Sequence, residues 1–277
     1  VCRMNDYLKL VNFEVKRFSK LFLTLIVAVI VAQVIGAFLT SFSYMNRVET
    51  TMAQKLLGES QYVHEYGAYN LQEFLFSGYF ILSIMFAASI LIIYVFFIWY
   101  RDWLGKSSFI YRLLMLPTAR RNIYFAKLTT ILLFVLCLVG IQIALLEVVQ
   151  LIIHGIIPDQ LRADSSKAYI YSFDILSFLY PKTPLLFALL YGLGATVVAV
   201  VFTAILFERS YHLKGIFLGV IYLVISIIVM AIPVIIQDIT GYLYLNEIIG
   251  LTAVTSILTL GVALYLADYL LKRKINV

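Results

Sequence analysis

Six long apolar runs dominate the sequence and limit the chain to one class of fold. Crossing the hydrocarbon core of a bilayer takes roughly 20 helical residues. The short alternating segments of a membrane β-barrel are absent. Because an α-helix satisfies its own backbone hydrogen bonds in lipid, the runs predict six transmembrane helices. These spans are Leu21–Phe42, Phe74–Tyr100, Leu128–Ile153, Pro184–Phe207, Ile216–Ile236 and Ile248–Tyr269.

Composition excludes a soluble globular protein of 277 residues. Hydrophobic residues make up 63% of the chain and charged residues 13%, whereas soluble domains have about one half and one quarter. The parts outside the spans are too small for a separate domain. We therefore expect an all-α polytopic membrane protein with one transmembrane domain over residues 1–277. We expect no cleavable signal peptide, because residues 1–20 are polar and basic and the first apolar run is too long for one.

The distribution of basic residues predicts the orientation. Sixteen of the 21 Lys and Arg residues lie in the amino terminus, the connection 101–127, the turn at Arg209 and Lys214, and the tail. Ten of the 15 acidic residues lie on the other side. Cytoplasmic connections carry the excess of Lys and Arg, so both termini are expected in the cytoplasm. This asymmetry accounts for the net charge of +6 without a nucleic-acid partner.

Two cytoplasmic segments have helical patterns without being spans. Residues 5–19 predict an interfacial amphipathic helix, with Leu8, Val11, Val15 and Phe18 on its apolar face. In the segment 101–127, Ser107 or Ser108 can cap a short helix that Pro117 ends. Its apolar side, with Phe109 and Leu113, can lie on the bilayer or fill a groove in another protein. Both uses are open from the residues alone.

The sequence lacks the residue patterns of catalysis. No H-E-x-x-H or G-x-S-x-G motif occurs, and His64, His154 and His212 lie in connections or at span ends. Gly105-Lys106-Ser107 resembles the end of a phosphate-binding loop, but Tyr100 stands where that loop needs its first glycine. We expect no enzyme, no metal and no cofactor in this chain. The middle of every span also lacks ionisable residues, which disfavours an ion-coupled transporter.

Small residues recur at helical spacing in spans 1 and 5, and aromatic residues gather near the end of span 2. Stripes of small residues let helices approach closely in lipid, either within one subunit or between two subunits. The aromatic group, which includes Tyr94, Trp99 and Trp103, favours an interface belt over a substrate cage. The small residues are Ala28, Ala32, Gly36, Gly215 and Gly219.

This arrangement resembles the permease subunits of bacterial ABC-2 type exporters. The topology is similar over nearly the whole chain. The residue-level likeness lies in about Trp103–Lys127, where Leu113-Leu114-Met115-Leu116-Pro117-Thr118-Ala119-Arg120 precedes Tyr124-Phe125-Ala126-Lys127. The resemblance implies a multi-pass protein of the bacterial plasma membrane.

The resemblance also implies partners. Two permeases, identical or related, would pair through spans 1 and 5, using Ala28, Ala32, Gly36, Gly215 and Gly219. Each would sit on a separate ATP-binding subunit that holds ATP and Mg. The helix between spans 2 and 3 would act as the coupling helix, contacting that subunit through Ser108, Phe109, Ile110, Arg112, Leu113, Leu114 and Leu116.

The resemblance indicates only the chemical class of the molecule that would be transported. The family's polysaccharide exporters often have re-entrant helices between spans 5 and 6, whereas only about Gln237–Glu247 separates these spans here. Export of a drug, an antimicrobial peptide or a lipid-like molecule is therefore favoured. Two alternatives stay open: an ion-coupled transporter or channel without an ATPase, and a non-transporting membrane sensor or scaffold.

Overall fold

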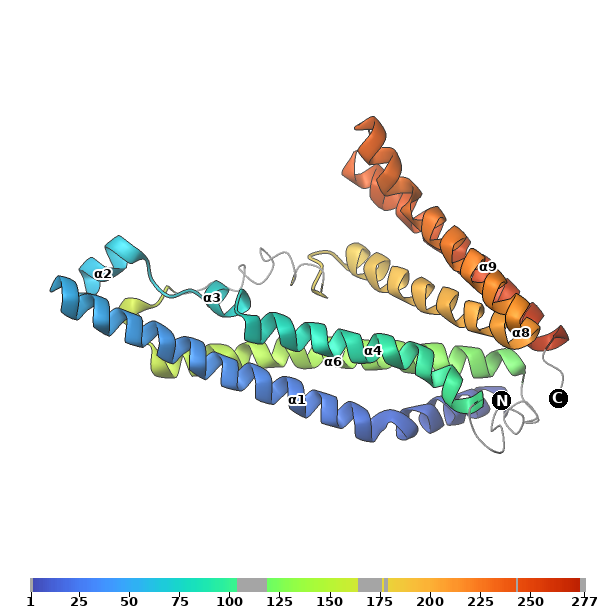
Figure 1. The fold of residues 1–277 in the computed structure, drawn as a ribbon, viewed down its shortest axis with the longest axis horizontal. Helices are drawn as coiled ribbons and strands as arrows, with labels where there is room; N and C mark the ends of the chain where they lie inside the picture. Colours follow the sequence, from blue (N-terminus) through green and yellow to red (C-terminus); the bar gives the residue numbers. More distant parts are fainter. Residues whose placement is uncertain (1, 104–118, 164–175, 177–178, 243, 275–277) are drawn as a thin grey trace. The chain divides into compact units, whose positions relative to one another are not determined.

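Six long apolar helices make up most of the computed structural model (Figure 1), which confirms the all-α membrane fold. The structure describes the chain except for residues 1, 104–118, 164–175, 177–178, 243 and 275–277. The described part contains no β-strand, only an isolated bridge between Tyr69 and Arg162. The stretches able to span a membrane are Asp6–Lys55, Gly78–Trp103, Arg120–Ile156, Pro184–Tyr211, Leu213–Thr240 and Asn246–Lys272.

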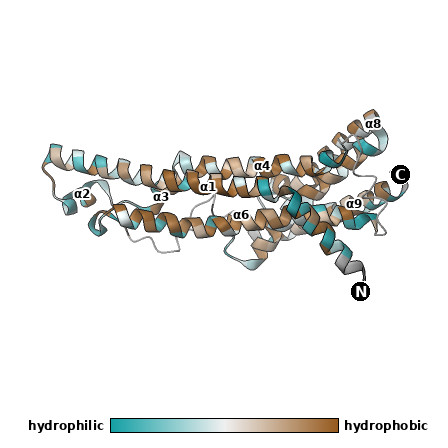
Figure 2. Ribbon diagram, turned by 90° about the horizontal axis from the view of Figure 1, so that it is seen from below, coloured by the Kyte–Doolittle hydropathy of each residue, from teal (hydrophilic) through white to brown (hydrophobic). Residues whose placement is uncertain are grey.

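Helix α1 (Cys2–Lys55) is longer than the sequence pattern predicts. One helix replaces the expected pair of an amphipathic helix at 5–19 and a span at Leu21–Phe42. The helix contains no proline and only Gly36 as a glycine, so nothing in it stops helical propagation. In Figure 2 the helix changes from brown to white and teal toward the end near α2, where its residues are more hydrophilic. An interfacial position for residues 5–19 stays a prediction.

The remaining helices are α2 (Glu59–Tyr66), α3 (Leu71–Leu75), α4 (Gly78–Trp103), α6 (Arg120–Ile156), α8 (Pro184–Thr240) and α9 (Leu245–Arg273), with a 3-10 turn η1 (Asp159–Leu161). The chain forms two compact units. The first contains Val1–Arg17, Leu91–Leu133 and Thr183–Val277. The second contains Phe18–Ile90 and Phe134–Lys182.

In the first unit, α8 is a tight hairpin of two spans. A Cβ atom added at Gly219 would lie 3.0 Å from the carbonyl oxygen of Ala204. In a straight helix those residues would be about 22 Å apart, because each residue advances the axis by about 1.5 Å. The chain therefore reverses between them, at the turn expected near Arg209 and Lys214. The second arm continues into α9, which packs along α8.

An aromatic core fills the first unit beside this hairpin. Trp99 and Tyr124 each meet the ring of Phe202 edge-on, with ring centroids 5.6 Å apart in both pairs. The Tyr124 hydroxyl donates a hydrogen bond to the carbonyl oxygen of Ala199 at 2.9 Å. Trp99 and Tyr94 are buried, so the predicted interface belt is wrong for these two residues. Phe96 and Phe97 do remain exposed.

In the second unit, the connections around α2, α3 and η1 belong to a hydrophobic core. Tyr69 packs edge-on against Tyr44 with ring centroids 4.8 Å apart. Its backbone N–H donates to Leu161 at 2.8 Å, and its carbonyl accepts from Ala163 at 2.9 Å. The same core includes Phe74, Leu75, Phe80, Ile157 and Tyr180. The described parts of these two connections therefore pack against each other.

A neutral polar network joins three helices inside the second unit. Gln33 of α1 donates to Ser83 of α4 and to Gln142 of α6, both at 2.9 Å. Gln142 donates back to the Gln33 side-chain oxygen at 3.0 Å. All three side chains are buried. We call them the amide network.

Candidate functional site

The predicted coupling residues lie outside the described part of the chain. They are Ser108, Phe109, Ile110, Arg112, Leu113, Leu114 and Leu116, all within the undescribed segment 104–118. The residues on either side are described. Helix α4 ends at Trp103 before this segment, and α6 begins at Arg120 after it.

A buried group of charged side chains lies close to both of these helix ends. It contains Glu14 and Arg17 from α1, Arg101 and Asp102 from α4, and Lys127 from α6. All five belong to the first unit. We call this group the ion-pair cluster.

Lys127 is at the centre of the ion-pair cluster. Its ammonium donates to Glu14 Oε1 at 2.6 Å, to Asp102 Oδ2 at 2.5 Å and to the carbonyl oxygen of Ile98 at 3.1 Å. An ammonium has three N–H donors, so each has an acceptor. The Lys127 and Asp102 side chains are 0% exposed and Glu14 is 3% exposed. A charge this deeply buried is tolerated only when it is paired and hydrogen-bonded.

Two arginines complete the pairing of the carboxylates. Arg17 binds Asp102 at 2.5 Å, and Arg101 binds Glu14 at 3.0 Å. Their side chains are 26% and 17% exposed. Three cations therefore face two carboxylates, and the excess positive charge is carried by the two side chains that reach the surface.

Aromatic residues and α8 surround the ion-pair cluster. The Lys127 ammonium lies 5.3 Å from the centroid of the buried Trp99 ring, within range of a cation–π attraction. The neighbouring Tyr100 hydroxyl donates to Glu208 of α8. Arg209 of α8 lies over the rings of Tyr100 and Trp103, at 4.9 and 5.6 Å from their centroids. Helix α8 is thus tied to the end of α4.

The sequence pattern does not reveal this cluster, because Lys127 and Asp102 stand in it only as charges of a connection. One signal was present. Leu10, Glu14 and Phe18 are spaced by four residues, which puts an acid on the same helix face as two large apolar residues. The structure buries all three. Leu8, on the predicted apolar face, is 56% exposed.

The five small residues assigned to dimer packing have different surroundings within the chain. A Cβ at Gly36 would lie 2.5 Å from Tyr79 Cβ, and one at Gly215 would overlap the carbonyl oxygen of Phe207. Packing within the chain thus accounts for Gly36, Gly215 and Gly219. Ala28 is exposed and Ala32 is half-buried. A role in a dimer stays a prediction for all five.

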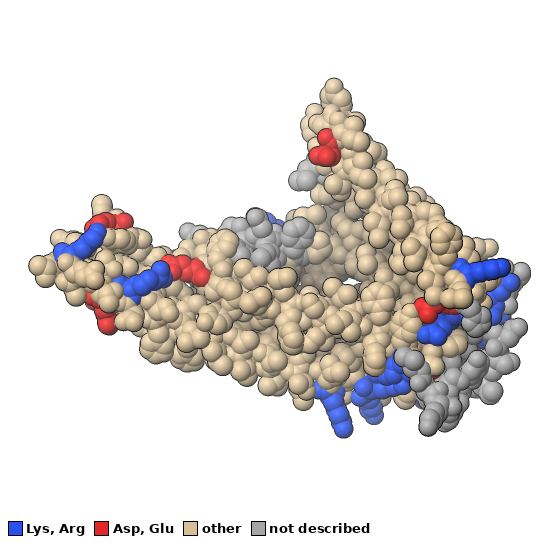
Figure 3. Space-filling view, viewed as in Figure 1, with Lys and Arg blue, Asp and Glu red and all other residues tan. Residues whose placement is uncertain are grey.

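The described residues include a structural joint between α1, α4 and α6, which is the ion-pair cluster. Among them, no group of three or more His, Cys, Asp or Glu side chains could hold a metal ion. In Figure 3 the charged side chains of the face drawn gather toward helix ends, leaving uncharged surface between them. No protein-family model, no curated protein and no solved structure matches this chain.

Proposed function

We propose that the chain is the membrane-spanning subunit of an ATP-driven exporter of the ABC-2 type. A separate ATP-binding subunit would dock on the helix at about 107–117 and supply all ATP hydrolysis. The structural observation that supports this function is the ion-pair cluster at both ends of segment 104–118. The resemblance of Trp103–Lys127 to the family supports it from the sequence.

The ion-pair cluster suits a segment that has to transmit force. Asp102 lies just before the segment and Lys127 shortly after it, and both bind α1 side chains as well as each other. A buried ion pair resists separation, because removing one partner leaves an unpaired charge that costs about 3–5 kcal/mol. A push on 104–118 would therefore move α1, α4 and α6 together.

The cargo proposed is amphipathic or hydrophobic: a drug, an antimicrobial peptide or a lipid-like molecule. The amide network is neutral, and the long helices are apolar along most of their length. Helix α8 ends at Thr240 and α9 begins at Leu245, with Gly241 turning the chain at a φ of +65°. That connection is too short for re-entrant helices, which argues against polysaccharide.

The test is purification of the chain from its own host in mild detergent, followed by identification of the proteins that remain bound. We expect a stoichiometric ATP-binding subunit with the wild-type chain and its loss in the double variant Phe109→Asp, Leu113→Asp. The matched control is Leu56→Asp with Phe76→Asp, which adds the same charges at exposed sites in the second unit. This control should retain the ATPase.

The other outcomes of this experiment identify the second permease or test the proposal itself. A second six-span chain in the sample would identify a heterodimer, whereas two copies of this chain would identify a homodimer. If the double variant kept the ATPase, the coupling assignment would fall. A wild-type chain that is folded and binds no ATPase would overturn the exporter proposal.

One observation favours a second candidate, an ion-coupled transporter. Lys127 with Glu14 and Asp102 is a buried group of ionisable side chains, and such groups are common in ion-coupled transporters. Against it, Lys127 lies seven residues after the start of α6, about 10 Å along the helix, and thus near a membrane surface rather than mid-membrane. Transport by the purified chain in vesicles driven by a pH gradient alone, and lost in Lys127→Met, would support this candidate.

A further inference from the structure

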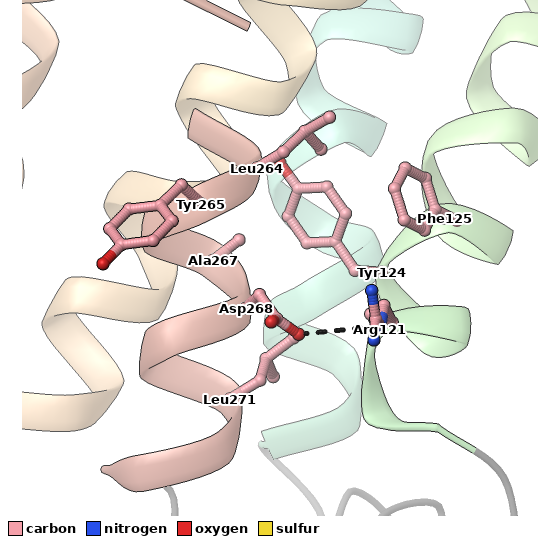
Figure 4. Close-up of a pocket in the computed structure, with 8 residues that line it drawn as sticks. All are labelled: Arg121, Tyr124, Phe125, Leu264, Tyr265, Ala267, Asp268 and Leu271. Carbon is pink, nitrogen blue, oxygen red and sulfur yellow. Dashed lines mark ion pairs between the residues drawn. The ribbon is translucent and has the colours of Figure 1, made fainter. Parts of the chain in front are cut away.

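A small cavity opens between the first turns of α6 and the last turns of α9, away from the ion-pair cluster. Its volume is about 240 Å³. The pocket is lined by Arg121, Tyr124 and Phe125 of α6 and by Leu264, Tyr265 and Asp268 of α9. In Figure 4 the Tyr265 ring points away from the α6 side chains. All belong to the first unit. We call this cavity the α6–α9 pocket.

The α6–α9 pocket has apolar walls and a basic rim. Arg121 Nε lies 3.8 Å from Asp268 Oδ1, and Lys272 Nζ lies 2.6 Å from Asp268 Oδ2. One carboxylate thus faces two cations. Arg121 lines the pocket, and Lys272 lies next to it through its ion pair with Asp268. Their side chains are 57% and 53% exposed. The local excess charge is positive.

The helix ends fix the depth of the pocket. Arg121 is the second residue of α6, and Asp268 lies five residues before the end of α9. The apolar run of α9 ends beside the basic rim, at about Tyr269, which places the pocket where headgroups meet acyl chains. Tyr265 is 73% exposed, and an amphipathic ring of this kind prefers that depth.

We propose that the α6–α9 pocket binds an anionic phospholipid. Arg121 and Lys272 contact its phosphate, and Leu264 with Tyr265 contacts the start of an acyl chain. A basic pocket between helices at the headgroup level has the chemistry that recognises such lipids. This inference is independent of the proposed transport function.

The charges and the apolar walls of the α6–α9 pocket disfavour two other classes of ligand. A soluble anion would leave the apolar wall in contact with water. An organic cation would need the Asp268 carboxylate, which Arg121 and Lys272 already share. A phospholipid covers the wall and adds a phosphate to the two cations without displacing either from the rim.

The test measures thermal unfolding of the purified full chain in uncharged detergent with added phosphatidylglycerol or phosphatidylcholine. We expect phosphatidylglycerol to raise the midpoint more than phosphatidylcholine does. Arg121→Gln should weaken apparent phosphatidylglycerol affinity about fivefold, the contribution of one basic side chain at a lipid surface. The control Lys214→Gln removes an equal charge at the α8 turn and should leave the affinity unchanged.

Native mass spectrometry provides a readout that does not depend on stability. One phosphatidylglycerol should remain bound to the wild-type chain, and a smaller fraction of Arg121→Gln should retain it at the same lipid concentration. Equal stabilisation by both lipids, or equal losses in Arg121→Gln and Lys214→Gln, would overturn the proposal. Competition by soluble glycerol phosphate would also overturn it, since that would identify a soluble anion as the ligand.

Discussion

Helices α1, α4 and α6 are joined by buried polar side chains in both units, once with charges and once without. The ion-pair cluster uses Glu14, Asp102 and Lys127, and the amide network uses Gln33, Ser83 and Gln142. The charged version occurs near the end of α4 and the start of α6, where Arg17 and Arg101 reach the surface. The neutral version lies in the apolar part of the helices. Of these two buried groups, the one with full ionic charge is the one that has added partners reaching the surface.

The largest expected effect is the loss of Lys127. Lys127→Met takes from Glu14 and Asp102 the fully buried cation that they share and leaves each carboxylate with one partly exposed arginine. The free energy of unfolding should therefore fall by about 3–5 kcal/mol. Denaturant or thermal unfolding in detergent measures this change. Lys20→Met, which removes an exposed lysine from α1, should change it by less than about 0.5 kcal/mol.

A neutral version of the ion-pair cluster sharpens this prediction. The triple variant Glu14→Gln, Asp102→Asn, Lys127→Met removes the three most deeply buried charges and leaves only Arg17 and Arg101, which reach the surface. It should therefore recover much of the stability lost in Lys127→Met. Equal instability of the two variants would mean that the charges themselves, not their balance, hold the helices together. If Lys127→Met unfolded at the same midpoint as the wild-type chain, the ion-pair cluster would no longer differ from the amide network in its expected effect on stability.

A smaller effect is expected at the amide network. Gln33→Leu leaves Ser83 and Gln142 without their shared partner, so unfolding should become easier by about 0.5–2 kcal/mol. The double variant Gln33→Leu, Gln142→Leu should cost less than the sum of the single changes, because it also removes the stranded amide. A double-mutant cycle measures this coupling. If Gln33→Leu lowered the free energy of unfolding as much as Lys127→Met does, the neutral and charged groups would not differ in strength.

Hydropathy predicted the number of spans and the turn inside α8, because burial in lipid depends on each residue's own chemistry. The bounds were less accurate. Helix α1 runs on to Lys55 since polar residues after Phe42 include no helix breaker. Gln33 was visible as a polar residue in an apolar run, but its partners were not. Pairing between Glu14 and Lys127 depends on how α1 packs on α6, and no local pattern encodes that geometry.

The smallest effect is expected at an exposed ion pair in the second unit. Arg47 and Glu73 lie 3.6 Å apart and are 68% and 45% exposed. Partial burial raises the pKa of the Glu73 carboxyl above its ordinary 4.5, and Arg47 lowers it to a lesser extent. The folded state therefore holds this proton more tightly than the unfolded state does. The contribution to stability is greatest below pH 4.5 and decreases as pH rises through the folded-state pKa.

Replacing Glu73 by Gln should remove this pH-dependent decrease and change stability near neutral pH by less than about 0.5 kcal/mol. Unfolding midpoints of both proteins between about pH 4 and 7 test this. A Glu73→Gln effect approaching that of Lys127→Met would mean that exposure does not separate weak from strong ion pairs in this protein.

The tight turn inside α8 has a consequence for how the protein is made. Because Gly215 packs against the carbonyl oxygen of Phe207 and Gly219 against Ala204, the two arms touch from their first turns onward. Arg209 and Lys214 hold that turn on one side of the bilayer. The spans Pro184–Tyr211 and Leu213–Thr240 should then leave the translocon and insert as a single hairpin.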